Sequence, residues 1–323
     1  MTTVVTAAAG TLAAGLVGYP PTIAGLRRLG AGQRVRADGP RSHHRKAGTP
    51  TAGGALFVGL VAVAWLAFSR AGLAGLVVAA GVLGGGLGLV DDWRNVRGTR
   101  GLGLRFWAKL GVLTALAAIL AAALTHFGWP AQVVPGLGLR SLGWGLPLLT
   151  AAAVLATSNA VNLTDGVDGL AAGVALPPFA ACAGLAVVEG QEPLALVAAS
   201  TCGALLAFLI YNRPRARIFM GDTGALALGC MLAVLATSLH LLILLPLLGV
   251  VFVLEAGSVI VQVAFFRLTH GRRLLRMSPF HHHLELGGMG EWAIDGRLWA
   301  LSLLGAVAAV AVALSAGLAG AGG

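Results

Sequence analysis

Long apolar runs, separated by short polar segments, extend along almost the whole chain. Ten such runs predict helices near 3–24, 52–69, 71–90, 106–126, 143–160, 170–188, 194–211, 222–239, 241–266 and 298–320. A helix needs about 20 mainly apolar residues to cross the hydrocarbon core of a bilayer. The pattern therefore predicts an all-α polytopic membrane protein with about ten transmembrane helices, formed by residues 1–323 as a single integral-membrane domain.

Composition supports this prediction and excludes a water-soluble fold. Of the 323 residues, 57% are hydrophobic and only 11% are charged, whereas soluble domains carry about 25% charged residues. The first apolar run has no basic residue before it and so lacks the charged region of a secretory signal, and we expect it to be the first span. The three cysteines stand singly in apolar runs and form no Cys-x-x-Cys pair, so we expect them in the core.

Basic residues lie in alternate polar segments and predict how the helices are oriented. Twenty of the 22 Lys and Arg residues lie in four segments, around 27–46, 94–109, 213–217 and 267–297, and the other two are Arg70 and Arg140. Because basic residues are retained on the cytoplasmic side, we expect these four segments in the cytoplasm and both termini outside. The net charge of +10 follows from this topology beside anionic lipids, and nothing indicates nucleic-acid binding.

Five aspartates stand at ends of predicted helices on the cytoplasmic side: Asp91, Asp92, Asp165, Asp168 and Asp222. A lone aspartate at a membrane boundary is ordinarily just solvated. Two adjacent anions, such as Asp91 and Asp92, repel each other unless a cation or basic group offsets them. Carboxylate oxygens suit Mg²⁺, which is usually held by one or two carboxylates together with substrate phosphates. Five carboxylates from three loops on one face therefore predict a Mg²⁺ site.

Basic side chains lie on the same side as these carboxylates. Lys46, Lys109 and the run Ser-Pro-Phe-His-His-His-Leu-Glu at 278–285 are expected to neutralise the charge of a diphosphate. Three consecutive histidines could instead bind zinc, but adjacent residues of a regular helix cannot all face one metal. The chain has no Walker loop, Gly-x-Ser-x-Gly elbow or Gly-x-Gly-x-x-Gly turn. The glycine run at 84–88 lies within a predicted span and indicates helix packing.

Several longer motifs resemble those of one family. They are Asp-Gly-Pro-Arg-Ser-His at 38–43, Lys-Ala-Gly-Thr-Pro-Thr-Ala-Gly-Gly at 46–54, the pair at 91–92, Asn-Ala-Val-Asn-Leu-Thr-Asp-Gly-Val-Asp-Gly-Leu at 159–170, Phe-Met-Gly-Asp-Thr-Gly-Ala-Leu-Ala-Leu-Gly at 219–229, Glu-Ala-Gly-Ser-Val-Ile-Val-Gln-Val at 255–263 and Pro-Phe-His-His-His-Leu-Glu-Leu at 279–286. Over nearly its whole length the chain resembles the phospho-N-acetylmuramoyl-pentapeptide transferases (MraY) of the polyprenyl-phosphate N-acetylhexosamine-1-phosphate transferase superfamily. The His triplet followed by Glu285 resembles the motif of this branch and not those of relatives that act on other N-acetylhexosamines.

The resemblance implies ten transmembrane helices, a homodimer, and a cytoplasmic cleft that the lipid enters from the bilayer of the bacterial inner membrane. It implies transfer of phospho-MurNAc-pentapeptide from UDP-MurNAc-pentapeptide to undecaprenyl phosphate, which gives lipid I and UMP. By motif position it implies that Asp222 binds Mg²⁺ and that the catalytic residues are Asp91, Asp92, Asp222, Lys109 and His281. The substrate-binding residues that it implies are Lys46, Thr51, Asn159, Asn162, Asp165, Asp168, Asn212, Phe219, Gln262, His282 and His283.

The chain departs from the family pattern at three places, and other functions stay open. Ala52 replaces a usual Met, Arg94 stands where Lys is common, and the proline within 213–216 is shifted. A sister transferase that uses UDP-GlcNAc remains an alternative, because spacing does not reveal sugar selectivity. An intramembrane aspartyl protease would need two aspartates inside facing helices sharing a proton. A transporter would need intramembrane charges, and only Glu255 qualifies.

Overall fold

The structure is a computed structural model, and it describes residues 1–32, 48–98 and 103–317. Lys46 and the motif at 38–43 lie outside these residues. The helices are α1 (Thr2–Arg28), α2 (Gly54–Phe68), α3 (Gly72–Arg97), α4 (Phe106–His126), α5 (Gly145–Thr164), α6 (Leu170–Val188), α7 (Glu192–Asn212), α8 (Gly221–Ser238), α9 (Leu245–Leu248), α10 (Val250–Leu268), α11 (Phe280–Leu286) and α12 (Glu291–Ser315), and the strands are β1 (Gln132–Val134) and β2 (Gly138–Arg140).

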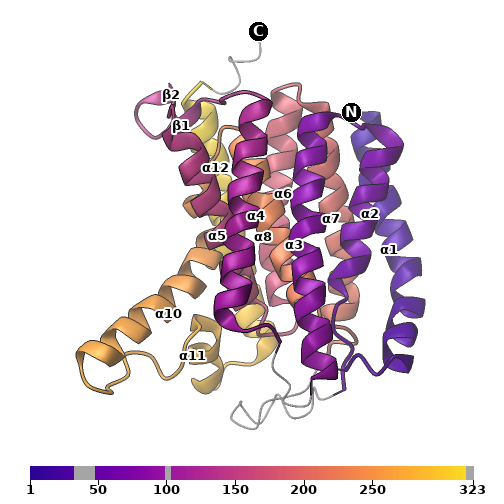
Figure 1. The fold of residues 1–323 in the computed structure, drawn as a ribbon, viewed down its shortest axis with the longest axis vertical. Coiled ribbons are helices and arrows are strands. Elements are labelled where there is room, and N and C mark those ends of the chain that lie inside the picture. Colours follow the sequence, from indigo (N-terminus) through magenta and orange to yellow (C-terminus); the bar gives the residue numbers. More distant parts are fainter. Residues whose placement is uncertain (33–47, 99–102, 318–323) are drawn as a thin grey trace.

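Nine of the described helices are long and apolar enough to cross a membrane: α1, α3, α4, α5, α6, α7, α8, α10 and α12. Helix α2 is also apolar but has only 15 residues. The prediction of an all-α polytopic protein with about ten transmembrane helices is therefore confirmed. Helix α1 begins and helix α12 ends at the same end of the bundle (Figure 1).

Several helices differ from their predicted bounds: α3 continues to Arg97 instead of ending near 90, and α5 continues to Thr164 instead of ending near 160. The run at 241–266 is not one helix, because α10 begins only at Val250, after a turn and the four-residue α9. Pro246 lies in the first turn of α9 and explains why the helix does not extend back through 241–244, since proline has no backbone N–H to donate and clashes with the preceding turn. The break between α9 and α10 falls at Gly249. Helix α12 begins at Glu291 rather than near 298. The apolar pattern missed its first two turns because they carry the charged residues Glu291, Asp295 and Arg297.

Helix α8 is the central helix of the bundle and is buried along nearly its whole length. It packs against α3 and α5, while α1 and α6 pack against α7. The closest approach is to α3, where a Cβ atom added to Gly84 would lie 2.8 Å from Cys230 Sγ, and one added to Gly88 would lie 2.1 Å from the Asp222 carbonyl oxygen. Glycines four residues apart let two helix backbones meet in this way. The glycine run at 84–88 is thus confirmed as a packing surface.

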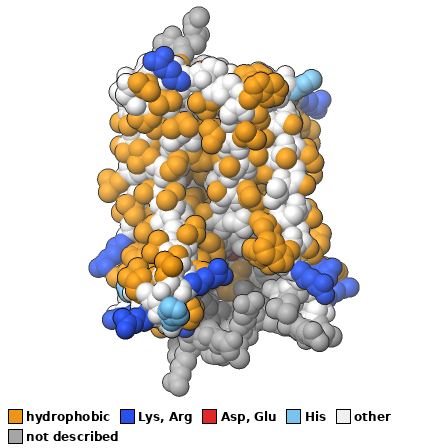
Figure 2. All heavy atoms as spheres, turned by 60° about the vertical axis from the view of Figure 1, so that its left-hand side comes forward, with side chains coloured by type: hydrophobic (Ala, Val, Ile, Leu, Met, Phe, Trp, Pro, Cys, Tyr) orange, Lys and Arg blue, Asp and Glu red, His pale blue; other side chains and the backbone are white. Residues whose placement is uncertain are grey.

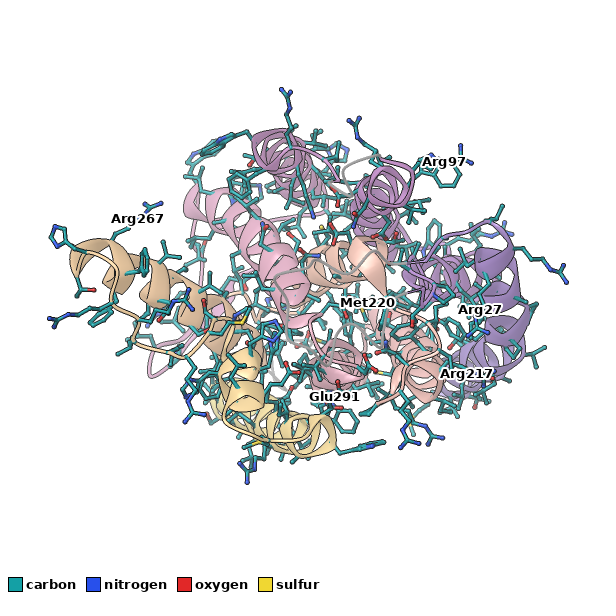
Figure 3. All side chains as sticks on the ribbon, turned by 90° about the horizontal axis from the view of Figure 1, so that it is seen from below. Arg27, Arg97, Arg217, Met220, Arg267 and Glu291 are labelled. Carbon is teal, nitrogen blue, oxygen red and sulfur yellow. The ribbon has the colours of Figure 1, made fainter. Side chains whose placement is uncertain are left out.

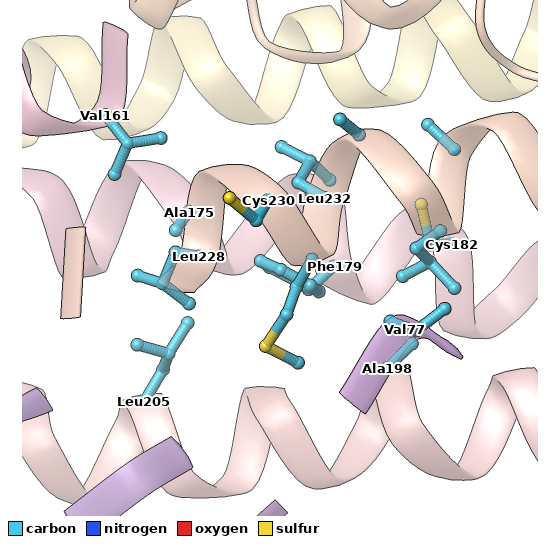
Figure 4. Packing of buried hydrophobic residues seen from close by; sticks show 14 of the residues in the cluster. Val77, Val161, Ala175, Phe179, Cys182, Ala198, Leu205, Leu228, Cys230 and Leu232 are labelled. Atoms are coloured by element: carbon cyan, nitrogen blue, oxygen red, sulfur yellow. The ribbon is translucent and has the colours of Figure 1, made fainter. Parts of the chain in front are cut away.

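The cysteines follow the same pattern of close packing. All three are free thiols, and Cys182 and Cys230 are fully buried among apolar side chains (Figure 4). Around them, Phe179 of α6, Leu205 of α7 and Leu228 of α8 belong to one buried cluster. Cys182 and Cys230 are therefore core residues, as predicted, and Cys202 is partly buried against the core.

A small hairpin fixes the far end of α8. Strands β1 and β2 are antiparallel, with Val133 opposite Leu139. The buried Gln132 side chain donates to the Thr237 carbonyl oxygen at 3.1 Å and accepts from the Leu242 backbone N–H at 2.9 Å. The Val133 backbone N–H donates to the carbonyl oxygen of residue 240 at 2.9 Å. These contacts hold the C-terminal end of α8 in place. Because α8 is a rigid helix, they also help to define the position of its N-terminal end, where Asp222 lies.

The surface has an apolar zone and a basic end. Figure 2 shows hydrophobic side chains over the length of the helices and Lys and Arg side chains gathered mainly at the lower end, the distribution expected of a protein surrounded by lipid. Figure 3 shows this lower end, which carries Arg27, Arg97, Arg217 and Arg267 and is called the basic end below. Met220, just before α8, lies near its middle.

Candidate functional site

The start of α8 is fixed by the glycine-rich segment that precedes α2. The Phe219 backbone N–H donates to the Pro50 carbonyl oxygen at 2.8 Å, and the Gly53 N–H donates to the Phe219 carbonyl oxygen at 2.9 Å. A Cβ atom on Gly54 would lie only 2.2 Å from the Gly224 Cα atom. The two consecutive glycines of this motif are therefore needed so that the segment can lie directly against the first turn of α8.

Asp92 caps the N-terminus of α8 from the neighbouring helix α3. Its Oδ1 accepts the Asp222 backbone N–H at 3.1 Å, and its Oδ2 accepts the Thr223 N–H at 3.1 Å and the Thr223 hydroxyl at 2.6 Å. The first N–H groups of a helix have no partner within the helix, and a negative charge there is favourable. The Asp92 side chain is buried. Its three hydrogen bonds to Asp222 and Thr223 hold the backbone of Asp222 in place.

Four helices bring polar side chains together around Asp222. Lys109 of α4 donates to its Oδ2, and Asn162 of α5 donates to its Oδ1 at 2.6 Å. Asp91 of α3 lies within hydrogen-bond reach of Asp222, and its Oδ2 is 3.9 Å from the Lys109 Nζ atom. The other Asp91 oxygen accepts the Leu104 N–H at 2.7 Å. We call Asp91, Lys109, Asn162 and Asp222 the aspartate–lysine cluster.

Two predicted substrate-binding residues hold loops in the structure. Asn212 accepts the Gly169 N–H at 3.0 Å and donates to the Ile218 carbonyl oxygen at 2.9 Å. Asp168 accepts the Ala216 N–H at 2.8 Å. Both side chains are buried. They therefore fix the turn after α5 against the segment that leads into α8, close to the aspartate–lysine cluster.

Four further predicted residues surround this region. Thr51 is buried, and a Cβ atom on Gly221 would lie 2.7 Å from its hydroxyl oxygen. Asn159 donates to the Leu155 carbonyl oxygen of its own helix at 2.7 Å. Asp165 directly follows α5, and Phe219 lies two residues before α8; both are partly exposed. The structure thus brings most of the predicted residues to one end of the bundle.

The three consecutive histidines lie on α11 and do not converge. They have separate partners: His281 faces Glu255, His282 Nδ1 is 3.2 Å from Glu285 Oε2, and His283 Nδ1 accepts the Arg276 backbone N–H at 3.1 Å. A single zinc ion held by all three is therefore not compatible with this helix. Burial lowers the pKa of His281 below its usual value, and the hydrogen bond with Glu255 opposes this shift.

Gln262, a predicted substrate-binding residue, holds the loop that follows α10. Its Oε1 accepts the N–H groups of Leu274 and Leu275 at 3.1 and 2.9 Å, and its Nε2 donates to the Leu275 carbonyl oxygen at 3.1 Å. Gln262 therefore ties the loop between α10 and α11 to α10 and sets the position of α11. Glu255, the partner of His281, was not predicted as a site residue. An acidic residue within an apolar span is the signal that could have identified it.

Comparisons with known proteins identify the family. Glycosyl transferase family 4 matches residues 73–240, about half of the chain. A phospho-N-acetylmuramoyl-pentapeptide-transferase of Moorella thermoacetica is 50% identical over 295 residues, which cover 90% of this chain and 92% of that protein. This chain belongs to the phospho-N-acetylmuramoyl-pentapeptide-transferase family. Family members from Geobacillus kaustophilus and Lactiplantibacillus plantarum are 44% and 42% identical over 288 and 298 residues, covering 86% and 90% of this chain and 88% and 92% of theirs.

Membership of the phospho-N-acetylmuramoyl-pentapeptide-transferase family confirms the resemblance deduced from the motifs. It places the chain among multi-pass membrane transferases rather than proteases or transporters. The geometry agrees with this assignment, because the Lys109 ammonium contacts Asp222 and lies near Asp91, whereas a protease dyad consists of two carboxyl groups that share a proton.

The same carboxylates suit a divalent cation in chemical type. Within residues 1–32, 48–98 and 103–317 there is no group of three or more His, Cys, Asp and Glu side chains arranged for a metal. Mg²⁺, however, usually takes only one or two carboxylates and completes its coordination with water and phosphate. Asp91 and Asp222 already have one cation, the Lys109 ammonium, near both of them. Their hard oxygen atoms therefore fit Mg²⁺ in the presence of phosphates.

Proposed function

We propose that this protein transfers phospho-MurNAc-pentapeptide from UDP-MurNAc-pentapeptide to undecaprenyl phosphate, and that lipid I and UMP are the products. The relatives in the comparisons are named for a transferase of this kind. The observation that carries the proposal is the aspartate–lysine cluster, in which four helices place two carboxylates, an ammonium and an amide at the basic end. In this proposal the basic end faces the cytoplasm, where basic residues are retained.

The main barrier to this reaction is bringing two phosphate groups together. A phosphate monoester has a second pKa near 6, so the lipid phosphate is mostly a dianion at neutral pH. At a separation of about 4 Å and an effective dielectric constant near 20, each pair of like unit charges costs about 4 kcal/mol. A site for this reaction must therefore supply positive charge and orientation more than it must supply a strong base.

The aspartate–lysine cluster meets this requirement with groups held in fixed positions. The Lys109 ammonium supplies positive charge beside Asp222, and Asn162 holds the other Asp222 oxygen. Asp91 is oriented by the Leu104 N–H. An oxygen of the lipid phosphate would attack the β-phosphorus in line, forming a new P–O bond while the bond to the α-phosphate breaks and UMP leaves with the electron pair.

Mg²⁺ is the proposed cofactor, with Asp222 as its ligand, and it would neutralise charge on the diphosphate when bound. We further propose that the protein works as a homodimer, as the family resemblance implies. The remaining residues serve this centre: Asp92 fixes the start of α8, and Asp168 and Asn212 fix the adjacent loops.

Release of UMP tests the proposed function directly. The purified protein in detergent is given undecaprenyl phosphate and Mg²⁺ with either UDP-MurNAc-pentapeptide or UDP-GlcNAc, and a reaction without the lipid phosphate is the control. We expect lipid-dependent UMP release with UDP-MurNAc-pentapeptide only. Release with UDP-GlcNAc alone would replace the proposal with the sister transferase, and no lipid-dependent release from either donor would contradict both.

A further inference from the structure

A buried carboxylate in α10 forms a close pair with the first histidine of α11. The side chains of Glu255 and His281 are both fully buried. Glu255 Oε2 accepts the His281 backbone N–H at 3.2 Å and lies 3.1 Å from the His281 Nδ1 atom. Two contacts from the same residue to one oxygen fix both the position of the backbone and the rotation of the ring.

The pair leaves two buried polar atoms without partners. Among the residues that the structure describes, neither Glu255 Oε1 nor His281 Nε2 has a hydrogen-bond partner, and both are inaccessible to solvent. Buried polar atoms of this kind are uncommon, because each loses its hydration without compensation. A pair that served only to join α10 to α11 would not need to leave the second ring nitrogen unsatisfied.

The free nitrogen of His281 is directed toward the turn after α5. A Cβ atom on Gly166 would lie only 2.3 Å from Nε2, so the ring edge lies directly against this turn. Gly166 follows Asn162 by four residues, about one helical turn, and Asn162 donates to Asp222. His281 therefore faces the segment that joins the aspartate–lysine cluster to the turn at 165–168.

The carboxylate also determines which ring nitrogen carries the proton. An ionised carboxylate can only accept hydrogen bonds, so the nitrogen that faces it must be a donor. In a neutral imidazole the other nitrogen is then an acceptor. With Nδ1–H directed at Glu255, His281 presents Nε2 as an acceptor.

We infer that Glu255 is a positioning residue for the transfer reaction, which holds His281 with the proton on Nδ1 and its ring edge against Gly166, and so fixes the turn at 165–168 that follows Asn162. This inference rests on the proposed function. It assigns His281 a role as a neutral ring that fixes this turn, distinct from the cationic role of Lys109.

The proton position can be measured without any catalytic assay. Protein labelled with ¹⁵N-histidine is reconstituted in nanodiscs, and the His281 signals are assigned by their loss in His281→Gln. We expect ¹⁵N shifts of a neutral ring protonated at Nδ1, and a shift of the proton toward Nε2 in Glu255→Leu. An Nε2-protonated His281 in the unaltered protein, or an unchanged His281 signal in Glu255→Leu, would overturn the inference. This result does not depend on which substrate the protein transfers.

Kinetics of three variants separate positioning from simple packing. Glu255→Leu loses the acceptor, and its kcat should fall on the order of 10–100-fold, as for other residues that orient an active-site histidine. Glu255→Gln keeps an oxygen for Nδ1–H, so it should retain the Nδ1-protonated signal and lose less activity. Ser258→Ala, whose hydroxyl donates within α10 to the Glu255 carbonyl oxygen, should behave as wild type. Equal losses in Gln and Leu variants, with the tautomer unchanged, would show that Glu255 acts only through packing.

Discussion

Replacing Gly88 with alanine is the sharpest test of how α3 positions the aspartate–lysine cluster. The added Cβ would lie 2.1 Å from the Asp222 carbonyl oxygen and 2.4 Å from the Thr223 backbone nitrogen. Carbon and oxygen atoms in close contact are ordinarily about 3.3 Å apart or more. The first turn of α8 would therefore have to move by about 1.2 Å relative to α3.

This displacement predicts a large loss of activity and a moderate loss of stability. A misplacement of about 1 Å at a reacting centre can lower the rate on the order of 10²-fold, and overpacking of a close-packed contact typically costs about 1–3 kcal/mol. Gly86→Ala is the matched control, because it lies on the same helix and its added Cβ would meet no atom within 4 Å.

Both variants are measured by UMP release with saturating substrates and by their thermal unfolding midpoints in detergent. We expect kcat of Gly88→Ala to fall on the order of 10²-fold while the protein remains folded, and Gly86→Ala to match the wild type. Wild-type kcat in Gly88→Ala, or an equal loss in Gly86→Ala, would refute the idea that this contact sets the position of Asp222.

Two further variants test the surroundings of Asp222. Asp92→Ala should lower the free energy of unfolding by about 1–3 kcal/mol, because the capped N–H groups of α8 lose a buried acceptor; a thermal midpoint equal to that of the wild type would argue against the cap. Lys109→Met, which keeps most of the side-chain length without the charge, should lower kcat for UMP release on the order of 10²-fold or more, since the mutually repelling phosphates lose the cation held beside Asp222. Normal kcat in Lys109→Met would show that this ammonium does not serve the transfer.

The helices could be predicted from the sequence because long apolar runs leave few other structures in a membrane. The predictions were less accurate where polar residues belong to a helix, as at the start of α12, or where a single proline interrupts an apolar run, as at Pro246. The hairpin at 132–140 and the short α11 have no apolar pattern of sufficient length. Their positions depend on tertiary contacts, such as those of Gln132 with the end of α8.

The site residues could be predicted as a set but not in their individual roles. Carboxylates at helix ends indicated where Asp91 and Asp222 would meet, and the structure brings them together with Lys109. The sequence could not distinguish Asp92, which points back at the backbone of α8, from its neighbour Asp91. The direction of each side chain depends on how two helices are rotated against each other, which spacing alone does not reveal.

Asp222→Asn is the substitution that most directly tests the proposed phosphate transfer. The amide keeps the size of the side chain but replaces the negatively charged oxygen beside Lys109 and removes the proposed Mg²⁺ ligand. UMP release is measured for wild type and variant while Mg²⁺ is titrated after chelation of divalent cations. We expect Mg²⁺-dependent release by the wild type and none above background by the variant. Ordinary release by Asp222→Asn, with an unchanged Mg²⁺ titration, would contradict the proposed role of Asp222.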